Sequence, residues 1–142
     1  MRPPSIIKFE RLFLASLAVS AIGFVIGYEA AMRVVESDPS MQRFGLGGGF
    51  MLGVLAASFA IYLLLWYLIA HRASTIAKWV LIVFVALGLV SLPFALTGPL
   101  SLTVALNLLV YVLEVVALVY LFRPDAKAWF RGESPPDPAA LD

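Results

Sequence analysis

Four long apolar segments fill most of this chain and determine what it can fold into. Each is about 20 residues long, the length that an α-helix needs to cross the hydrocarbon core of a bilayer. An α-helix satisfies its backbone polar groups within its own segment, as a bilayer requires, and segments of this length are predicted to be helical. With 62% hydrophobic and 13% charged residues, the 142-residue chain has too few charges for the surface of a soluble domain. The predicted spans are about residues 9–29, 47–70, 76–96 and 100–122, and residues 37–46 between the first two are predicted to form a loop.

The predicted fold is an all-α integral membrane bundle of four transmembrane helices in up-down-up-down order. Residues 1–131 form its single domain, which closes with a short interfacial helix at residues 124–131. Pro124 suits the first position of that helix, and aromatic and basic side chains fall on its opposite faces. Residues 132–142 hold three prolines and three acids and are predicted to be disordered.

Lysine and arginine are distributed unequally between the two sides of the predicted bundle. Eight lie on the side of both termini and two on the other side, so both termini are predicted to be cytoplasmic in a bacterial inner membrane. The alternative for the first span is a cleaved signal peptide, although no clear A-x-A site closes it. The eight residues are Arg2, Lys8, Arg11, Arg72, Lys78, Arg123, Lys127 and Arg131, and the two are Arg33 and Arg43.

The fourth apolar segment carries a polar stripe that includes a carboxylic acid. At 100° per residue, its four polar side chains fall within about 80° on one helix face, while the other faces are Leu, Val and Ala. Such a face cannot be turned to lipid, so it is predicted to point into the bundle or toward a partner subunit. The four residues are Thr103, Asn107, Tyr111 and Glu114.

Glu114 is the residue on which a functional interpretation depends. It lies about eight residues, or roughly 12 Å, from the cytoplasmic end of its helix, within the inner half of the membrane. The other spans offer Tyr62, Ser16 and Ser20 at that depth, and no Lys or Arg. A low dielectric favours the uncharged form of an unpaired carboxyl group, so we expect Glu114 to be protonated at neutral pH.

Two functions are compatible with this pattern. The favoured one is a structural or accessory role in a membrane assembly, either as a homo-oligomer or as a subunit of a larger complex, with Glu114 hydrogen-bonded across the bundle or to a partner. The alternative is a small proton-linked transporter or channel, because acids inside membrane spans commonly mark proton or ion sites. In that case Asn107, Tyr111 and Tyr62 would line the site around Glu114.

Small residues recur at helical spacing in the first two spans. Gly23 and Gly27 form a GxxxG pair in the first, and Gly49 and Gly53 lie at the same spacing in the second. Small residues four apart let helix backbones approach closely in a membrane. We therefore expect these two pairs to meet where the first two spans cross.

Several kinds of site are not indicated by the sequence. The chain has no cysteine and a single histidine, His71, which we interpret as an interfacial residue rather than a metal ligand. The glycine run at residues 45–49 is not followed by the Gly-Lys-Ser/Thr of a phosphate loop. No second acid, cofactor motif or basic cluster for nucleic acid is apparent, so we expect no enzyme activity, no cofactor, no metal and no nucleic-acid partner.

The two ends of the chain resemble those of small four-span inner-membrane proteins of bacteria. Lys8-Phe9-Glu10-Arg11-Leu12 leads into the first span, and Leu121-Phe122-Arg123-Pro124 is followed by Trp129-Phe130. The resemblance covers the whole length of the chain and implies a multi-pass protein in contact with the lipid bilayer. It implies no particular activity or functional residues.

Overall fold

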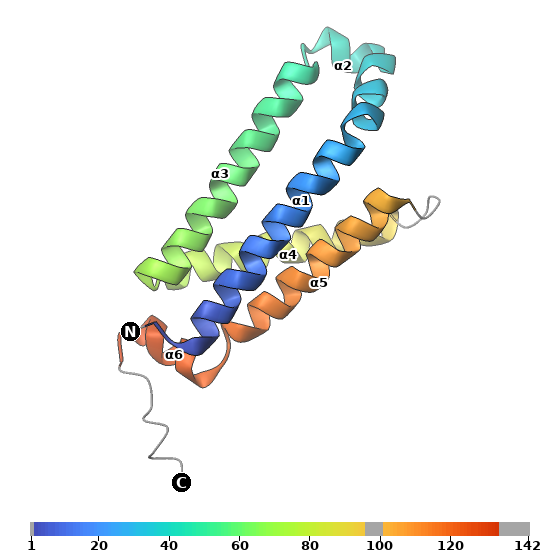
Figure 1. Cartoon of the computed structure of the whole chain (residues 1–142). Helices are drawn as coiled ribbons and strands as arrows, with labels where there is room; N and C mark the ends of the chain where they lie inside the picture. Colours follow the sequence, from blue (N-terminus) through green and yellow to red (C-terminus); the bar gives the residue numbers. More distant parts are fainter. Residues whose placement is uncertain (1, 96–100, 134–142) are drawn as a thin grey trace.

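Helices make up the regular structure of the part of the chain that the computed structural model describes, residues 2–95 and 101–133, with no strand among them (Figure 1). Four of these helices, α1, α3, α4 and α5, are long and apolar enough to cross a membrane, which confirms that part of the prediction. Most of the predicted tail, and the turn between the third and fourth spans, lie outside the described residues. The helices are α1 (Pro4–Ser37), α2 (Pro39–Arg43), α3 (Gly48–Arg72), α4 (Thr75–Ala95), α5 (Leu102–Tyr120) and α6 (Pro124–Arg131).

The connection after α1 differs from the predicted loop, because it contains the short helix α2. Asp38 has an extended backbone, as expected for a residue that precedes proline, and this ends α1. The same residue then caps α2, since its carboxylate accepts a hydrogen bond from the Ser40 amide at 2.8 Å. The prediction of a loop over residues 37–46 was therefore wrong for Pro39–Arg43.

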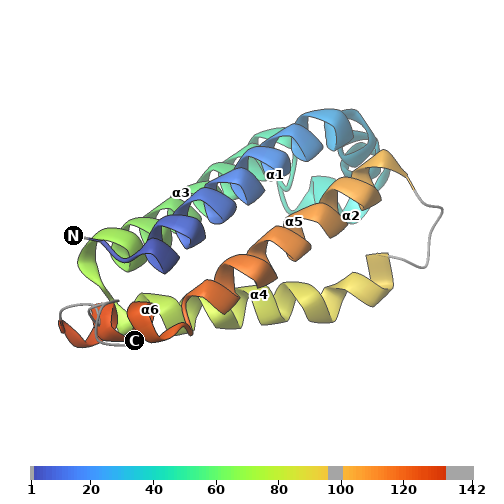
Figure 2. The same cartoon turned by 60° about the horizontal axis from the view of Figure 1, so that its bottom comes forward.

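The buried core lies toward one end of the bundle. This end, here called the α6 end, holds the N-terminus, the α3–α4 connection and α6, and α2 lies at the opposite end (Figures 1 and 2). α1 packs most extensively against α5, whereas α3 and α4 diverge from their connection toward the α2 end. The largest core side chains are Phe9, Phe13, Ile6, Ile69, Leu81 and Leu121, all of them at the α6 end.

The glycine pairs of the first two spans do not meet, which corrects the predicted helix crossing. A Cβ atom at Gly23 would lie 3.7 Å from Cβ of Leu106 in α5, and one at Gly27 would lie 3.5 Å from Cγ2 of Thr103. Cβ atoms at Gly49 and Gly53 would meet nothing within 4 Å. The small residues of α1 therefore admit side chains of α5, its main neighbour, and leave the glycine face of α3 open.

This arrangement predicts opposite outcomes for two glycine substitutions. Gly23 is buried, so Gly23→Leu should force its extra atoms against Leu106 and lower the free energy of unfolding by about 1–3 kcal/mol. At Gly53 a larger side chain would enter open space in the single chain, so Gly53→Leu should change the free energy of unfolding little. Thermal melting of both variants in mild detergent tests the pair, and equal melting of Gly23→Leu and the parent would contradict this packing.

The end helix α6 docks onto the bundle through polar as well as apolar contacts. The Asp125 carboxylate accepts hydrogen bonds from the Ser5 amide at 3.1 Å and the Ser5 hydroxyl at 2.8 Å. It thus lies at the N-termini of both α1 and α6, where unpaired amides favour a negative charge. Ala126 and Ala128 are buried, and the Trp129 indole donates to the Ile69 carbonyl at 3.4 Å.

The Asp125 contact makes stability depend on pH. Burial alone would raise the pKa of Asp125, but the hydrogen bonds from Ser5, together with those from the backbone amides of Ala126 and Asp125, outweigh it and hold that pKa below its usual value. The stabilisation is therefore present above about pH 4 and is lost as pH falls through the folded-state pKa. Asp125→Asn should lower the free energy of unfolding by about 1 kcal/mol at pH 7, with a smaller deficit at pH 3. Melting curves at both pH values test this, and an equal deficit at both would count against the contact.

Candidate functional site

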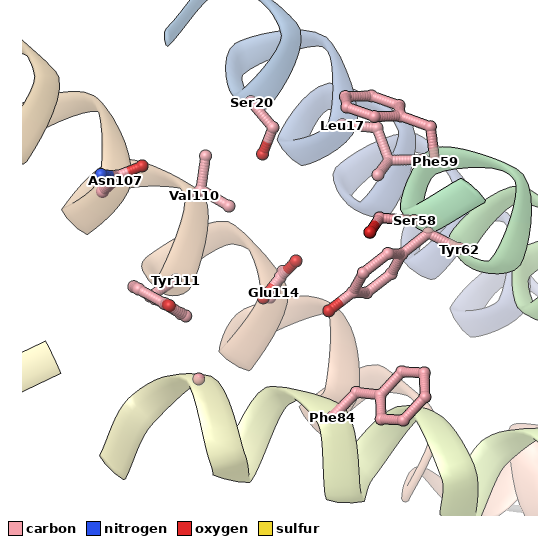
Figure 3. A pocket seen from close by; sticks show the side chains of 11 residues that line it. Leu17, Ser20, Ser58, Phe59, Tyr62, Phe84, Asn107, Val110, Tyr111 and Glu114 are labelled. Atoms are coloured by element: carbon pink, nitrogen blue, oxygen red, sulfur yellow. The ribbon is translucent and has the colours of Figure 1, made fainter. Parts of the chain in front are cut away.

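The polar stripe of α5 faces a cavity inside the bundle. This cavity, of about 200 Å³, is partly open and is lined by residues of α1, α3, α4 and α5. Glu114 lines it and is only 6% exposed, and the Tyr62 side chain of α3 extends its hydroxyl toward Glu114 (Figure 3). The lining residues are Leu17, Ser20, Ser58, Phe59, Tyr62, Phe84, Gly88, Asn107, Val110, Tyr111 and Glu114.

Four of the five polar residues singled out from the sequence line this one cavity. Asn107, Tyr111 and Glu114 come from α5, and Tyr62 comes from α3. The fifth, Thr103, lies nearer the α2 end of α5, where its methyl group contacts the Gly27 position of α1. Thr103 is therefore part of the helix contact and is not among the lining residues.

The hydroxyl groups near Glu114 do not all point toward it. Ser16 donates its hydroxyl to the Phe13 carbonyl of its own helix at 2.7 Å, and Ser58 donates to the Val54 carbonyl at 2.8 Å. Of the hydroxyl groups that the sequence offered to Glu114, that of Ser16 is thus bonded within its own helix, while Ser20 and Tyr62 share the cavity with Glu114. Among the described residues no hydrogen-bond donor to the Glu114 carboxyl group is found, so its polar atoms face the cavity.

Aromatic rings close the cavity toward the α6 end. Tyr62 lies between Phe13 of α1 and Phe84 of α4, with ring centroids 6.1 Å apart in both pairs. Phe13 stacks in turn on Phe9 at 5.4 Å, deeper in the core. Ser20, Ser58 and Asn107 line the cavity nearer the α2 end, the direction in which α3 and α4 diverge (Figure 3). The polar space is thus separated from the α6 end by packed rings.

The contribution of α4 was not predicted from the sequence. Phe84 and Gly88 line the cavity, although the third span has no polar stripe that would have indicated this. Glycine at position 88 lets the Tyr111 ring of α5 approach the α4 backbone closely, because a Cβ atom there would lie 2.8 Å from Cε1 of that ring. An isolated glycine within an apolar span was the one available signal, and by itself it indicates only that something packs closely.

Positive charge is held away from the cavity, at the α6 end. The Lys78 ammonium group lies 4.8 Å from the ring centre of Phe130, 5.2 Å from Phe122 and 5.6 Å from Trp79. Lys78 is only 8% exposed, and among the described residues its ammonium group lies near aromatic rings and in no ion pair. No group of three or more His, Asp or Glu side chains that could hold a metal ion occurs within residues 2–95 and 101–133.

Comparisons with protein-family models, with curated proteins and with solved structures found no match to this chain. The functional argument therefore depends on the geometry of the cavity.

Proposed function

We propose that this chain is a multi-pass membrane protein that binds a proton or a small cation at Glu114 and couples that binding to transport. One observation carries the proposal. Glu114 is nearly fully buried, its carboxyl group has no donor among the described residues, and it lines a cavity between four apolar helices. Acids at such positions are costly in a membrane and typically serve proton or ion binding. The proposal includes no catalytic step, since Glu114 is the only acid among the lining residues.

The orientation that we propose has both termini in the cytoplasm of a bacterial cell, with the spans running up, down, up and down. The N-terminus, the α3–α4 connection and α6 lie at one end of the bundle, and their segments contain eight of the ten Lys and Arg residues. The positive-inside rule supports a cytoplasmic α6 end. With this orientation, the packed rings lie on the cytoplasmic side of the cavity. A reporter active only in the periplasm should work when inserted at Ser40 and be silent after Asp142, and the reverse pattern would overturn the orientation.

Cation-coupled proton movement tests the transport proposal. The full chain would be placed in lipid vesicles that contain a pH-sensitive dye and have an acidic interior. Sodium, potassium and organic ammonium salts would then be added outside in turn. A rise of internal pH with at least one cation, above that of protein-free vesicles, is expected, and no rise with any of them would contradict the proposal.

A structural or accessory role in a membrane assembly is the second candidate. The open glycine face of α3, around Gly49 and Gly53, favours it, because small residues suit contact with another membrane helix. Purification in mild detergent separates the two candidates. A stoichiometric partner or a stable oligomer that Gly53→Leu disrupts would support assembly, whereas a monomer with cation-coupled proton movement would support transport.

A further inference from the structure

The cavity around Glu114 has an aromatic wall as well as a polar one. Phe59 and Tyr62 come from α3, Phe84 from α4 and Tyr111 from α5, so three helices contribute rings to the lining, and the two tyrosines lie on either side of Glu114 (Figure 3). Ring faces attract cations, most strongly where water is excluded. A single carboxylate among rings therefore offers one negative charge and several weakly attractive faces to a single positive charge.

The size of the cavity distinguishes among cations. One water molecule takes up about 30 Å³ in the liquid, so a cavity of about 200 Å³ holds several times that volume. A bare metal ion would need several oxygen ligands close together. Glu114 is the only carboxylate among the lining residues, and aromatic carbon occupies much of the rest of the lining. A cation that carries its own carbon atoms fills this space and contacts the rings directly.

Aromatic rings already lie around one alkylammonium group of this protein, outside the cavity. Lys78 is held at the α6 end by the faces of three rings, 4.8–5.6 Å from its ammonium nitrogen. The cavity at Glu114 combines rings of the same kind with a carboxyl group that lacks a donor among the described residues.

We propose that the ligand of this cavity is a small organic ammonium ion, whose charge lies against Glu114 and whose alkyl groups lie against Tyr62, Phe84 and Tyr111. This inference rests on the proposed function, since it names the class of cation that the site binds. The positive charge replaces the missing donor at the carboxylate, and the alkyl groups replace water at the rings.

Choline and its uncharged carbon isostere, 3,3-dimethylbutan-1-ol, test the inference with nearly equal shapes. Binding to the full-length protein in lipid nanodiscs would be measured by calorimetry. Choline is expected to bind about tenfold more tightly than the isostere, as a carboxylate and ring faces together would give. Phe84→Leu should weaken choline binding several-fold, while Phe44→Leu, at an exposed ring outside the cavity, should leave it unchanged.

The possible outcomes separate this inference from the proposed function. Equal binding of choline and the isostere would overturn the inference and indicate an apolar cavity. Displacement of choline by equimolar sodium or potassium would also overturn it and indicate a metal-ion site. In either case, alkali-cation-driven proton efflux in vesicles would still support the proposed function. The comparison of choline with its isostere uses the unaltered protein, so the test does not depend on whether a variant folds.

Discussion

Glu114→Gln is expected to abolish cation-coupled proton movement, down to the level of protein-free vesicles, without changing the fold. Glutamine keeps the shape of the side chain and its hydrogen-bonding atoms, but it can neither release a proton nor carry the charge that a cation requires. Because no donor to the Glu114 carboxyl group occurs among the described residues, the substitution breaks no hydrogen bond within that part of the chain. Vesicle flux and thermal melting, measured on the same preparation, check the two halves of the prediction.

A matched substitution and a harsher one complete this experiment. Glu29→Gln removes an exposed acid, which is paired with Arg33 at 3.5 Å, and should leave flux unchanged. Glu114→Leu should abolish flux as completely as Glu114→Gln and still leave the protein folded. If Glu114→Leu instead dissociated an oligomer or a complex while Glu114→Gln did not, the assembly role would replace the transport role.

Of the substitutions proposed for this protein, Phe13→Ala is expected to lower the free energy of unfolding most. Phe13 is 1% exposed, and its ring lies between those of Phe9 and Tyr62. The free energy of unfolding should fall by about 3 kcal/mol, near the lower limit for truncating a buried phenylalanine to alanine. The decrease is near that limit because, in lipid, removing the ring mainly removes van der Waals packing. The same change at Phe50, which is 53% exposed, should have little effect. Thermal melting of Phe13→Ala and Phe50→Ala in detergent checks this prediction. Similar decreases in stability for the two variants would contradict a packed core at the α6 end.

The polar half of the site could be predicted from the sequence, whereas most of its helix neighbours could not. Helical periodicity places Asn107, Tyr111 and Glu114 on one face, and the cost of turning that face to lipid requires it to point toward protein. The pairing of helices depends on close van der Waals fit, because lipid is as apolar as the helices themselves. The hydrophobic pattern therefore did not indicate that Gly23 packs against Leu106 of α5, or that Phe84 of α4 lines the cavity.

The docking of α6 was missed for a different reason. Its aromatic and basic faces predicted a helix lying on the membrane surface, and its start at Pro124 is as predicted. The bonds between Asp125 and Ser5 join residues 120 positions apart. Nothing in the local pattern of either segment indicates that they are neighbours.

The central claim is that Glu114 faces a space that cations can enter from water. The most direct test is whether a cysteine placed in the cavity reacts with a thiol reagent dissolved in water. The chain has no cysteine, so each single-cysteine variant gives an unambiguous signal. Ser20→Cys lines the cavity, and Val25→Cys lies on the same helix at a site 74% exposed outside the lining residues. A membrane-impermeant thiol reagent, added on the side opposite the termini, should modify Ser20→Cys, and choline should slow the reaction. Val25→Cys should stay unmodified. If Ser20→Cys were as unreactive as Val25→Cys from both sides, the cavity would be dry, and the account of a cation site at Glu114 would be contradicted.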